Sequence, residues 1–231
     1  MSDGLSATEA AAAHYRALPR EGRLPGRCEM RLPEGLEGAR VLDLLCREGK
    51  GAFKLADRVG EDGLVLACDP DAARIARAEG RRADAEAAGE PWAARLALRC
   101  GLPEDLRALG AADADFDLVY VNASLNVVYD FDAVLAEAAR VLAPGGRLWV
   151  AGLFAADEAS ALPEAEAAAA AASGNVFAAA RSLSQMEAAG ARAGFRSCSF
   201  FDVCGVAPDG ADAAPELAGR RFVAADACLE R

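Results

Sequence analysis

Apolar residues in this chain form two patterns: short continuous runs, and stretches in which they recur every three or four positions. Residues 41–45 form an apolar run broken by Asp43, the apolar residues of 53–59 follow helical spacing, and a second run at 64–68 closes on Asp69. Short continuous runs predict buried strands, and the spaced stretch predicts a helix between them. Two strands joined by a helix lie parallel with a right-handed crossover, so these residues predict a strand–helix–strand unit.

The same alternation continues to the end of the chain and predicts one α/β domain after an N-terminal helical cap segment, residues 1–35. The domain covers residues 36–231, and its alanine-rich stretch 155–181 is expected to form a lid, helical or mobile. Further strands are expected at residues 96–99, 116–121, 147–154, 197–203 and 221–228, and further helices at 6–18, 72–88, 130–142 and 184–193.

Four of these helices begin with capping signals, and for the helix at 130–142 the expected cap is Asp130 or Asp132. Ser6 and Ser184 each have a glutamate three positions later, which is the spacing of a capping box. Pro70 has a φ angle suited to the first turn of a helix, and the Asp71 carboxylate is suited to accept hydrogen bonds from the free amides there. A loop rich in proline and glycine ends most of the expected helices.

Polar residues stand where the expected parallel strands end. Asp69 follows the second strand, and Asn122 follows the run at 116–121. Open α/β sheets bind ligands at this edge, and an acid about 20 residues beyond the first turn suits the two hydroxyls of a ribose. The turn at 45–51, LCREGKG, lacks the G-x-G-x-x-G of nicotinamide-binding turns. A nucleoside-type ligand other than a dinucleotide is therefore the first hypothesis.

Composition narrows the class of partner. The chain has 231 residues, 53% of them hydrophobic, and a formal net charge of −11, which disfavours a nucleic acid partner and favours a small-molecule substrate. Its seven cysteines are odd in number and show no CxxC spacing, which favours a reducing cytoplasm over a disulfide framework. The single histidine excludes a multi-histidine metal site, and no long apolar span predicts a membrane helix. The expected protein is cytoplasmic, without a metal or a membrane partner; its oligomeric state is not indicated.

Residues 41–69 resemble the first two motifs of the class I S-adenosylmethionine (SAM)-dependent methyltransferases, V-L-D-L-G-C-G-x-G followed by V-x-G-x-D. The resemblance extends over 36–228 and includes G-x-x-E-D-L at 101–106 and L-x-P-G-G-x-L at 142–148. It implies a Rossmann-like seven-stranded, mostly parallel sheet with helices on both faces, closed by two antiparallel strands. It also implies SAM as methyl donor and S-adenosylhomocysteine as product.

The resemblance assigns roles to residues at the ligand edge. Asp69 would hold the ribose, Gly49 would let the backbone approach the methionine portion, and Asp43 would anchor the turn and face the amino group. Asn122 would contact the methionine end or the substrate. The full expected cofactor set is Tyr15, Asp43, Leu45, Arg47, Gly49, Asp69, Pro70, Leu102, Asn122 and Leu125. In-line methyl transfer needs alignment rather than a catalytic dyad, and no general base is assigned.

Leu45 and Arg47 occupy two positions that are glycine in the family motif. Their side chains either fill space that the cofactor needs, or Arg47 binds the methionine carboxylate, since a guanidinium recognises carboxylates bidentately. A third reading has Arg47 projecting into solvent. The first case would leave a non-catalytic binding or assembly protein on this fold, and the second a SAM-dependent small-molecule methyltransferase.

Within the class, the nearest resemblance is to the arsenite methyltransferase group, in stretches such as N-A-S-L-N-V at 122–127. That group binds arsenic through cysteine thiolates, one of them directly after the asparagine, where this chain has Ala123. A second cysteine, expected near residues 173–175, is also missing, and Cys28 or Cys46 would have to replace them. Arsenic methylation is therefore not expected.

Overall fold

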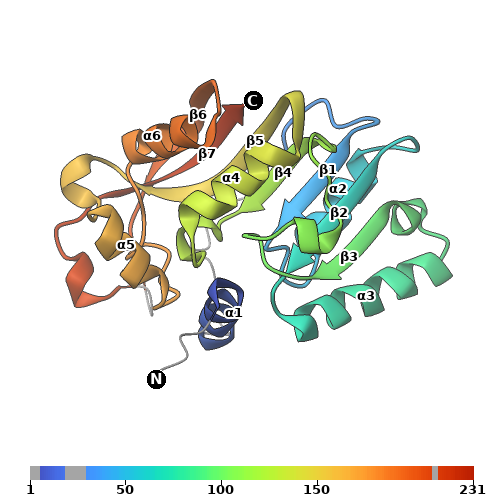
Figure 1. The fold of residues 1–231 in the computed structure, drawn as a ribbon, viewed down its shortest axis with the longest axis horizontal. Coiled ribbons are helices and arrows are strands. Elements are labelled where there is room, and N and C mark those ends of the chain that lie inside the picture. The colour runs from blue at the N-terminus through green and yellow to red at the C-terminus, as the bar shows by residue number, and fades with distance from the viewer. Residues whose placement is uncertain (1–5, 19–29, 210–212) are drawn as a thin grey trace.

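A computed structural model describes residues 6–18, 30–209 and 213–231 of the chain, and its centre is a seven-stranded sheet (Figure 1). The strands are β1 (Arg40–Leu44), β2 (Leu64–Asp69), β3 (Leu96–Cys100), β4 (Phe116–Asn122), β5 (Leu142–Ala155), β6 (Ser197–Val206) and β7 (Phe222–Glu230). The α-helices are α1 (Ala7–Ala17), α2 (Lys50–Arg58), α3 (Ala72–Ala87), α4 (Phe131–Val141), α5 (Glu164–Ala171) and α6 (Leu183–Ala193). Short 3₁₀ turns are η1 (Pro91–Arg95), η2 (Arg107–Leu109), η3 (Leu125–Val127), η4 (Glu158–Ser160) and η6 (Pro215–Leu217).

The strand order is β3-β2-β1-β4-β5-β7-β6, and the first five strands in that order are parallel. β7 pairs antiparallel with both β5 and β6. The expected Rossmann-like sheet with two closing antiparallel strands is therefore confirmed. The order reverses between β1 and β4, and ligands bind beyond the carboxyl ends of strands at such a switch point.

Helices cover both faces of the parallel strands, because successive side chains of a buried strand point to opposite faces. Leu42, Leu44, Val119 and Val121 pack with α4 and α6 in one core cluster. Val41, Leu118 and Tyr120 pack with α2 and α3 in the other. α1 crosses the carboxyl edge (Figure 1), where the His14 imidazole makes a 2.8 Å hydrogen bond with the Val127 carbonyl.

Helix starts follow the expected capping chemistry with one correction. Ser6 forms a capping box with Glu9, and Asp71 accepts hydrogen bonds from the first amides of α3. The box of α6 is formed by Ser182 and Gln185, two positions earlier than expected, so the prediction of Ser184 with Glu187 is wrong. The parallel bridge between Ala155 and Ser182 extends the chain up to Ser182, which fixes the start of the helix there.

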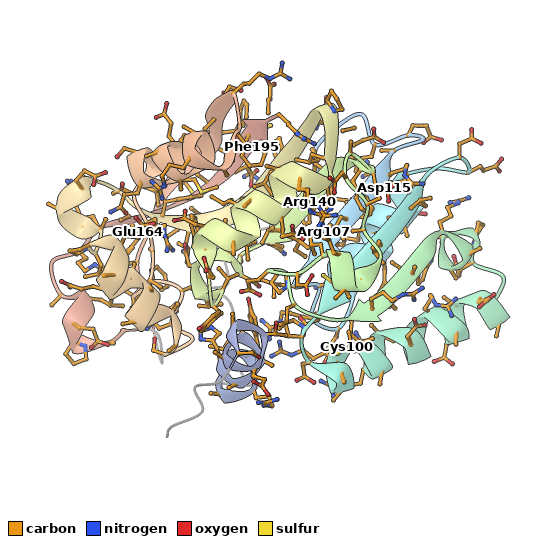
Figure 2. All side chains as sticks on the ribbon, in the orientation of Figure 1. Cys100, Arg107, Asp115, Arg140, Glu164 and Phe195 are labelled. Atoms are coloured by element: carbon orange, nitrogen blue, oxygen red, sulfur yellow. The ribbon has the colours of Figure 1, made fainter. Side chains whose placement is uncertain are left out.

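The alanine-rich stretch leaves the carboxyl end of β5 and returns to it. The Ala155 amide donates a 2.8 Å hydrogen bond to the Arg181 carbonyl, which closes the excursion. Within it, α5 buries Ala167 and Ala171. Figure 2 shows Glu164, the first residue of α5, on the opposite side of the molecule from Cys100 at the end of β3. Among the described residues, no helix is long and apolar enough to cross a membrane.

Candidate functional site

The turn between β1 and α2 keeps the backbone path of a glycine-rich loop without most of the glycines. Leu45 has φ 58°, Arg47 φ 53° and Gly49 φ 80°. The left-handed region costs a residue with a Cβ about 1–2 kcal/mol, so two of these three positions carry strain. The positions where the family motif has glycine are thus the positions where the backbone still requires that conformation.

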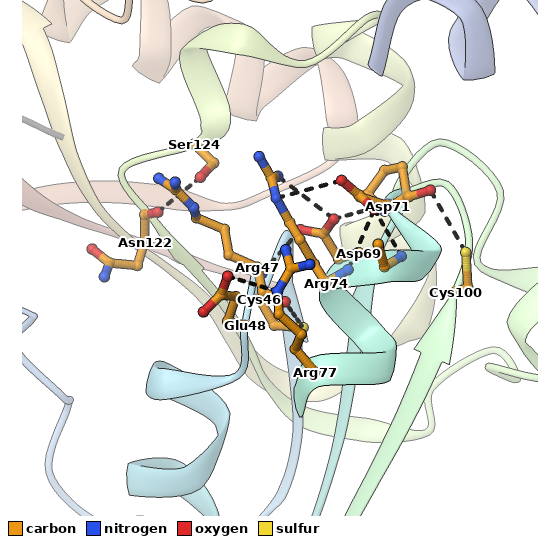
Figure 3. Close-up of polar contacts among 12 residues, drawn as sticks. Cys46, Arg47, Glu48, Asp69, Asp71, Arg74, Arg77, Cys100, Asn122 and Ser124 are labelled. Atoms are coloured by element: carbon orange, nitrogen blue, oxygen red, sulfur yellow. Dashed lines mark hydrogen bonds and ion pairs between the residues drawn. The ribbon is translucent and has the colours of Figure 1, made fainter. Parts of the chain in front are cut away.

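The Asp69 side chain holds this turn (Figure 3). Its Oδ2 accepts a 2.9 Å hydrogen bond from the Arg47 amide, and its Oδ1 accepts one of 2.9 Å from the Asp71 amide. The Arg74 guanidinium lies 3.7 Å away, and Asp69 is 1% exposed. Burial raises the pKa of Asp69, while the two amides and Arg74 oppose the rise. Asp69 was expected to bind the ribose, but both of its carboxylate oxygens already accept hydrogen bonds from the backbone of the chain itself.

A cavity of about 680 Å³ opens beside this turn at the carboxyl edge of the sheet. This volume lies in the range of small-molecule and cofactor sites. The expected residues Asp43, Leu45, Arg47 and Asn122 meet in it. Its other described lining residues are Met30, Cys46, Glu48, Lys50, Gly51, Lys54, Asp71, Ala73, Arg74, Arg77 and Arg81.

Two buried acceptors in the wall of the cavity have no partner among the described residues. They are Asp43 Oδ2 and Asn122 Oδ1. Asp43 is 2% exposed, and burial, followed by the charge of Asp69, raises its pKa well above the usual value. Buried acceptors without partners are uncommon in folded proteins, and two of them facing one cavity indicate a ligand that donates hydrogen bonds.

Arginines of α3 form the opposite wall, and sequence reasoning missed them. Glu48 Oε1 accepts from Arg77 Nε at 2.9 Å and Glu48 Oε2 from Arg81 Nη2 at 3.1 Å, which lowers the pKa of Glu48. The signal was available in the spacing of Arg74, Arg77 and Arg81, since residues three and four apart share one face of a helix.

Residues 36–190 match the model of the methyltransferase domain family. The chain belongs to this family. A curated relative, the arsenite methyltransferase of Aquipseudomonas alcaligenes, is 37% identical over 129 residues, 55% of this chain and 36% of that protein. The demethylmenaquinone methyltransferase of Beutenbergia cavernae is 37% identical over 115 residues, 49% of this chain and 40% of that protein. The chain thus matches well under half the length of these curated relatives.

A solved structure extends the similarity to nearly the whole chain. The arsenic (III) S-adenosylmethionine methyltransferase of Chlamydomonas reinhardtii has a TM-score of 0.77 at 27% identity, covering 98% of this chain and 74% of its own. The [4+2]-cyclase SpnF shares the fold with a TM-score of 0.58 at 19% identity, covering 84% of this chain and 75% of its own. The chain therefore has the class I methyltransferase fold and sequence similarity to the arsenite methyltransferase group, as its motifs predicted.

The remaining residues of the expected set lie outside the described lining of the 680 Å³ cavity. Tyr15 donates a 2.7 Å hydrogen bond to Glu104 Oε1, and burial raises its pKa. Pro70 and Leu102 are half-buried, and their contacts with a cofactor stay predictions, as does that of Tyr15. Gly49 caps α2 from below the turn. Cys28 lies outside the described residues.

A second, smaller pocket lies on the other side of the end of β4, and sequence reasoning missed its charged residue. Asn122 lines the cavity described above, whereas the next residue, Ala123, lines this pocket. Leu125, expected at the cofactor, also lies here, with apolar residues of β5 around it. The charged residue is Arg181, which is 6% exposed and lies with its guanidinium 3.6 Å from the centre of the Phe131 ring.

Proposed function

We propose that this protein is a SAM-dependent methyltransferase that acts on a small molecule. The observation that carries the proposal is the pair of buried acceptors without partners, Asp43 Oδ2 and Asn122 Oδ1, in the wall of a cavity at the carboxyl edge of the sheet. The α-ammonium group of SAM donates hydrogen bonds of the kind these acceptors lack. SAM would supply an electrophilic methyl group there: the acceptor's lone pair would bond to the methyl carbon while the C–S bond breaks in line and S-adenosylhomocysteine leaves.

The chain's own residues bind and orient the donor. Asp43 and Asn122 accept hydrogen bonds from the ammonium, and Arg47, which lines the same cavity, pairs with the carboxylate of the methionine portion. Asp69 is the residue that fits least well, because the Arg47 and Asp71 amides occupy its oxygens. Each carboxylate oxygen has a further lone pair, so ribose binding requires Arg74 to move aside rather than the turn to unfold.

Arsenite is not the methyl acceptor in this proposal. Ala123 lacks the thiolate expected there, and Cys46 is the one cysteine among the described residues lining either pocket. Burial raises the pKa of Cys46, which disfavours the thiolate that metal-like ligands need. Free cysteines in the described chain are compatible with work in a reducing cytoplasm, as composition predicts.

Titration calorimetry with SAM and S-adenosylhomocysteine tests the cofactor. We expect saturable binding of both, weakened by about 2–4 kcal/mol in Asp43→Ala and by about 1–2 kcal/mol in Asn122→Ala. Asp57→Asn is the matched control, because Asp57 is exposed on α2 and does not line the cavity. A folded wild-type protein that binds neither compound would contradict the proposal and favour a non-catalytic binding or assembly protein on this fold.

Arsenite tests the acceptor. With a thiol reductant and SAM, we expect no methylated arsenic product from the wild-type protein, while other small molecules are turned over. The product analysis should include Cys28→Ser and Cys46→Ala variants. Robust arsenite turnover that is lost in either variant would show that these cysteines replace the missing thiolates.

A further inference from the structure

The pocket beyond Ala123 contains one buried cation that no described residue neutralises by contact. Arg181 is the only basic residue between Arg147 and Arg192 in the sequence, and it lies in a stretch rich in alanine. Its guanidinium is stacked on the Phe131 ring and makes no hydrogen bond or ion pair with any described residue. Burying a charge without a partner is costly, so a fold that keeps one usually has a ligand for it.

Nearby acids are already paired with another arginine. Asp132 and Glu164 are the carboxylates whose charge reaches Arg181, and both bind Arg192 Nη2, at 3.0 Å and 3.1 Å. Burial lowers the pKa of Arg181 to about 10, so the group stays charged at neutral pH. Arg192 is exposed and has two acidic partners, whereas Arg181 is buried and has none within contact among the described residues.

The walls around Arg181 are apolar and are joined to the cofactor side. Leu125, Phe154 and Met186 line the pocket together with Arg181, and Ala123 in its wall directly follows Asn122, which lines the larger cavity. An acceptor bound here would lie at the carboxyl end of β4, next to a methyl donor bound in the cavity. Apolar walls with a single cation fit an apolar molecule that carries one negative group.

The pocket is small in the described conformation, with a volume of about 10 Å³, which is space for about one water molecule. Asn126 Nδ2 donates to the Leu153 carbonyl at 2.8 Å and to the Val176 carbonyl at 3.1 Å, so it ties the wall to the alanine-rich stretch. A carboxylate needs more room than this. Its entry therefore requires the walls to move apart, and the expected lid, residues 155–181, supplies Arg181 to one of them.

We propose that Arg181 binds the carboxylate of the methyl acceptor, which is a small, mainly apolar carboxylic acid held between β4, β5 and the lid. The role of this acid as methyl acceptor rests on the proposed function, but the binding of a carboxylate by Arg181 does not depend on SAM. A planar guanidinium binds a carboxylate through two parallel hydrogen bonds, and the low polarity of the pocket strengthens them. A neutral amide of the same shape makes a weaker contact and leaves the charge uncompensated.

Binding of benzoate and benzamide in the absence of SAM tests the inference. We expect wild-type protein to bind benzoate at least tenfold more tightly than benzamide. Arg181→Met should lose at least tenfold in benzoate affinity, and Arg181→Lys should recover part of it. Arg107→Met is the control, since Arg107, labelled in Figure 2, is exposed, pairs with Asp113 and lines neither pocket. The benzoate affinity of this variant should not change.

Thermal unfolding of the ligand-free proteins gives a second readout. If Arg181 served only to pack the fold, Arg181→Met would lower Tm, whereas the inference predicts a rise. We expect Arg181→Met to raise Tm, because methionine fills the space without burying a charge. A lower Tm in Arg181→Met, equal affinities for benzoate and benzamide, or no benzoate binding to the wild type would each overturn the inference. SAM titration of Arg181→Met should be unchanged, so failure of SAM binding and failure of carboxylate binding are separate results.

Discussion

The two pockets that flank the end of β4 treat buried charge in opposite ways. Beside β1, the buried Asp69 carboxylate is bound by two backbone amides and Arg74, and the partly exposed Glu48 next to it pairs with two arginines. In the pocket beside β5, Arg181 has a ring for a neighbour and no contacting acid among the described residues. The charges beside β1 hold the turn between β1 and α2 in its conformation. The Arg181 charge beside β5 holds no described segment by a hydrogen bond or an ion pair.

This difference indicates which charges belong to folding and which to ligands. A buried group whose hydrogen bonds are all made by the chain adds to stability, and its removal exposes unpaired partners. A buried group that lacks partners costs stability until a ligand supplies them. Asp43 belongs to the second kind although it lies in the cavity beside β1, 2% exposed and with Oδ2 unpaired among the described residues. The predictions below test this division.

The largest effect on stability is expected at Asp69, because its carboxylate binds the backbone of the turn between β1 and α2. Asp69→Ala removes the acceptor of two amides in a turn that is already strained at Leu45 and Arg47. We expect the free energy of unfolding, measured with urea, to fall by about 3–5 kcal/mol, since each unpaired buried amide costs about 1–3 kcal/mol. Asp71→Ala, which removes a helix cap, should cost only about 1 kcal/mol. Equal losses in the two variants would contradict the division.

Asp226 offers a buried acid outside both pockets and should show what an unpaired charge costs without a ligand. It is 5% exposed, its Oδ2 has no partner among the described residues, and burial raises its pKa to about 6. Because this pKa lies above that of the unfolded chain, about 3.9, the fold loses stability as pH rises through about 6.

Asp226→Asn removes that loss. Relative to wild type, its free energy of unfolding should increase by about 2–3 kcal/mol between pH 4 and pH 7. Denaturation at several pH values measures the difference. A difference that does not vary with pH would mean that the Asp226 carboxyl finds a partner in solution.

Sequence reasoning predicted the sheet well because its signals are local. The apolar runs fixed six of the strands to within a few residues, and the alternation with helices fixed the parallel order. The site was predicted only in part. Asp43 and Asn122 were found because they follow or interrupt apolar runs, and the carboxyl edge brings such positions together.

The partners of Asp69 and the burial of Arg181 could not be predicted from the sequence, because both depend on the three-dimensional path of the backbone. A carboxylate at the end of a strand, such as that of Asp69, is equally suited to bind a ribose or backbone amides. In this chain the positive φ of Arg47 directs the Arg47 amide to Asp69. Arg181 lies in a stretch without periodicity, so nothing in the local pattern indicates that it is buried. Its isolation among alanines was the one available signal.

The pH dependence of cofactor binding tests Asp43 as the unpaired buried acid of the cavity beside β1. Its pKa is raised by burial, and SAM brings an ammonium that favours the ionised form. Below that pKa, binding must release a proton, so affinity should rise about tenfold for each pH unit and become constant above it. Calorimetry in two buffers of different ionisation enthalpy counts the proton. Asp43→Asn should bind weakly with no such dependence; a wild-type profile with the same pH dependence as that of Asp43→Asn would remove Asp43 from the binding site.

The smallest effect concerns the strain of the turn. Arg47→Gly relieves a left-handed residue, φ 53°, and should gain about 1 kcal/mol in the free energy of unfolding, less the entropy that glycine adds to the unfolded chain. Ala114→Gly is the matched control, because Ala114 is exposed, has φ 56° and lies in neither pocket, and its stability change should be similar. The two variants should then differ in calorimetric SAM affinity alone: Arg47→Gly should lose about 1–2 kcal/mol, the value of a partly exposed contact with the methionine carboxylate, and Ala114→Gly should lose none. A gain in affinity for Arg47→Gly would instead mean that the arginine side chain obstructs the cavity, and that this turn keeps the path of a glycine loop while blocking its ligand.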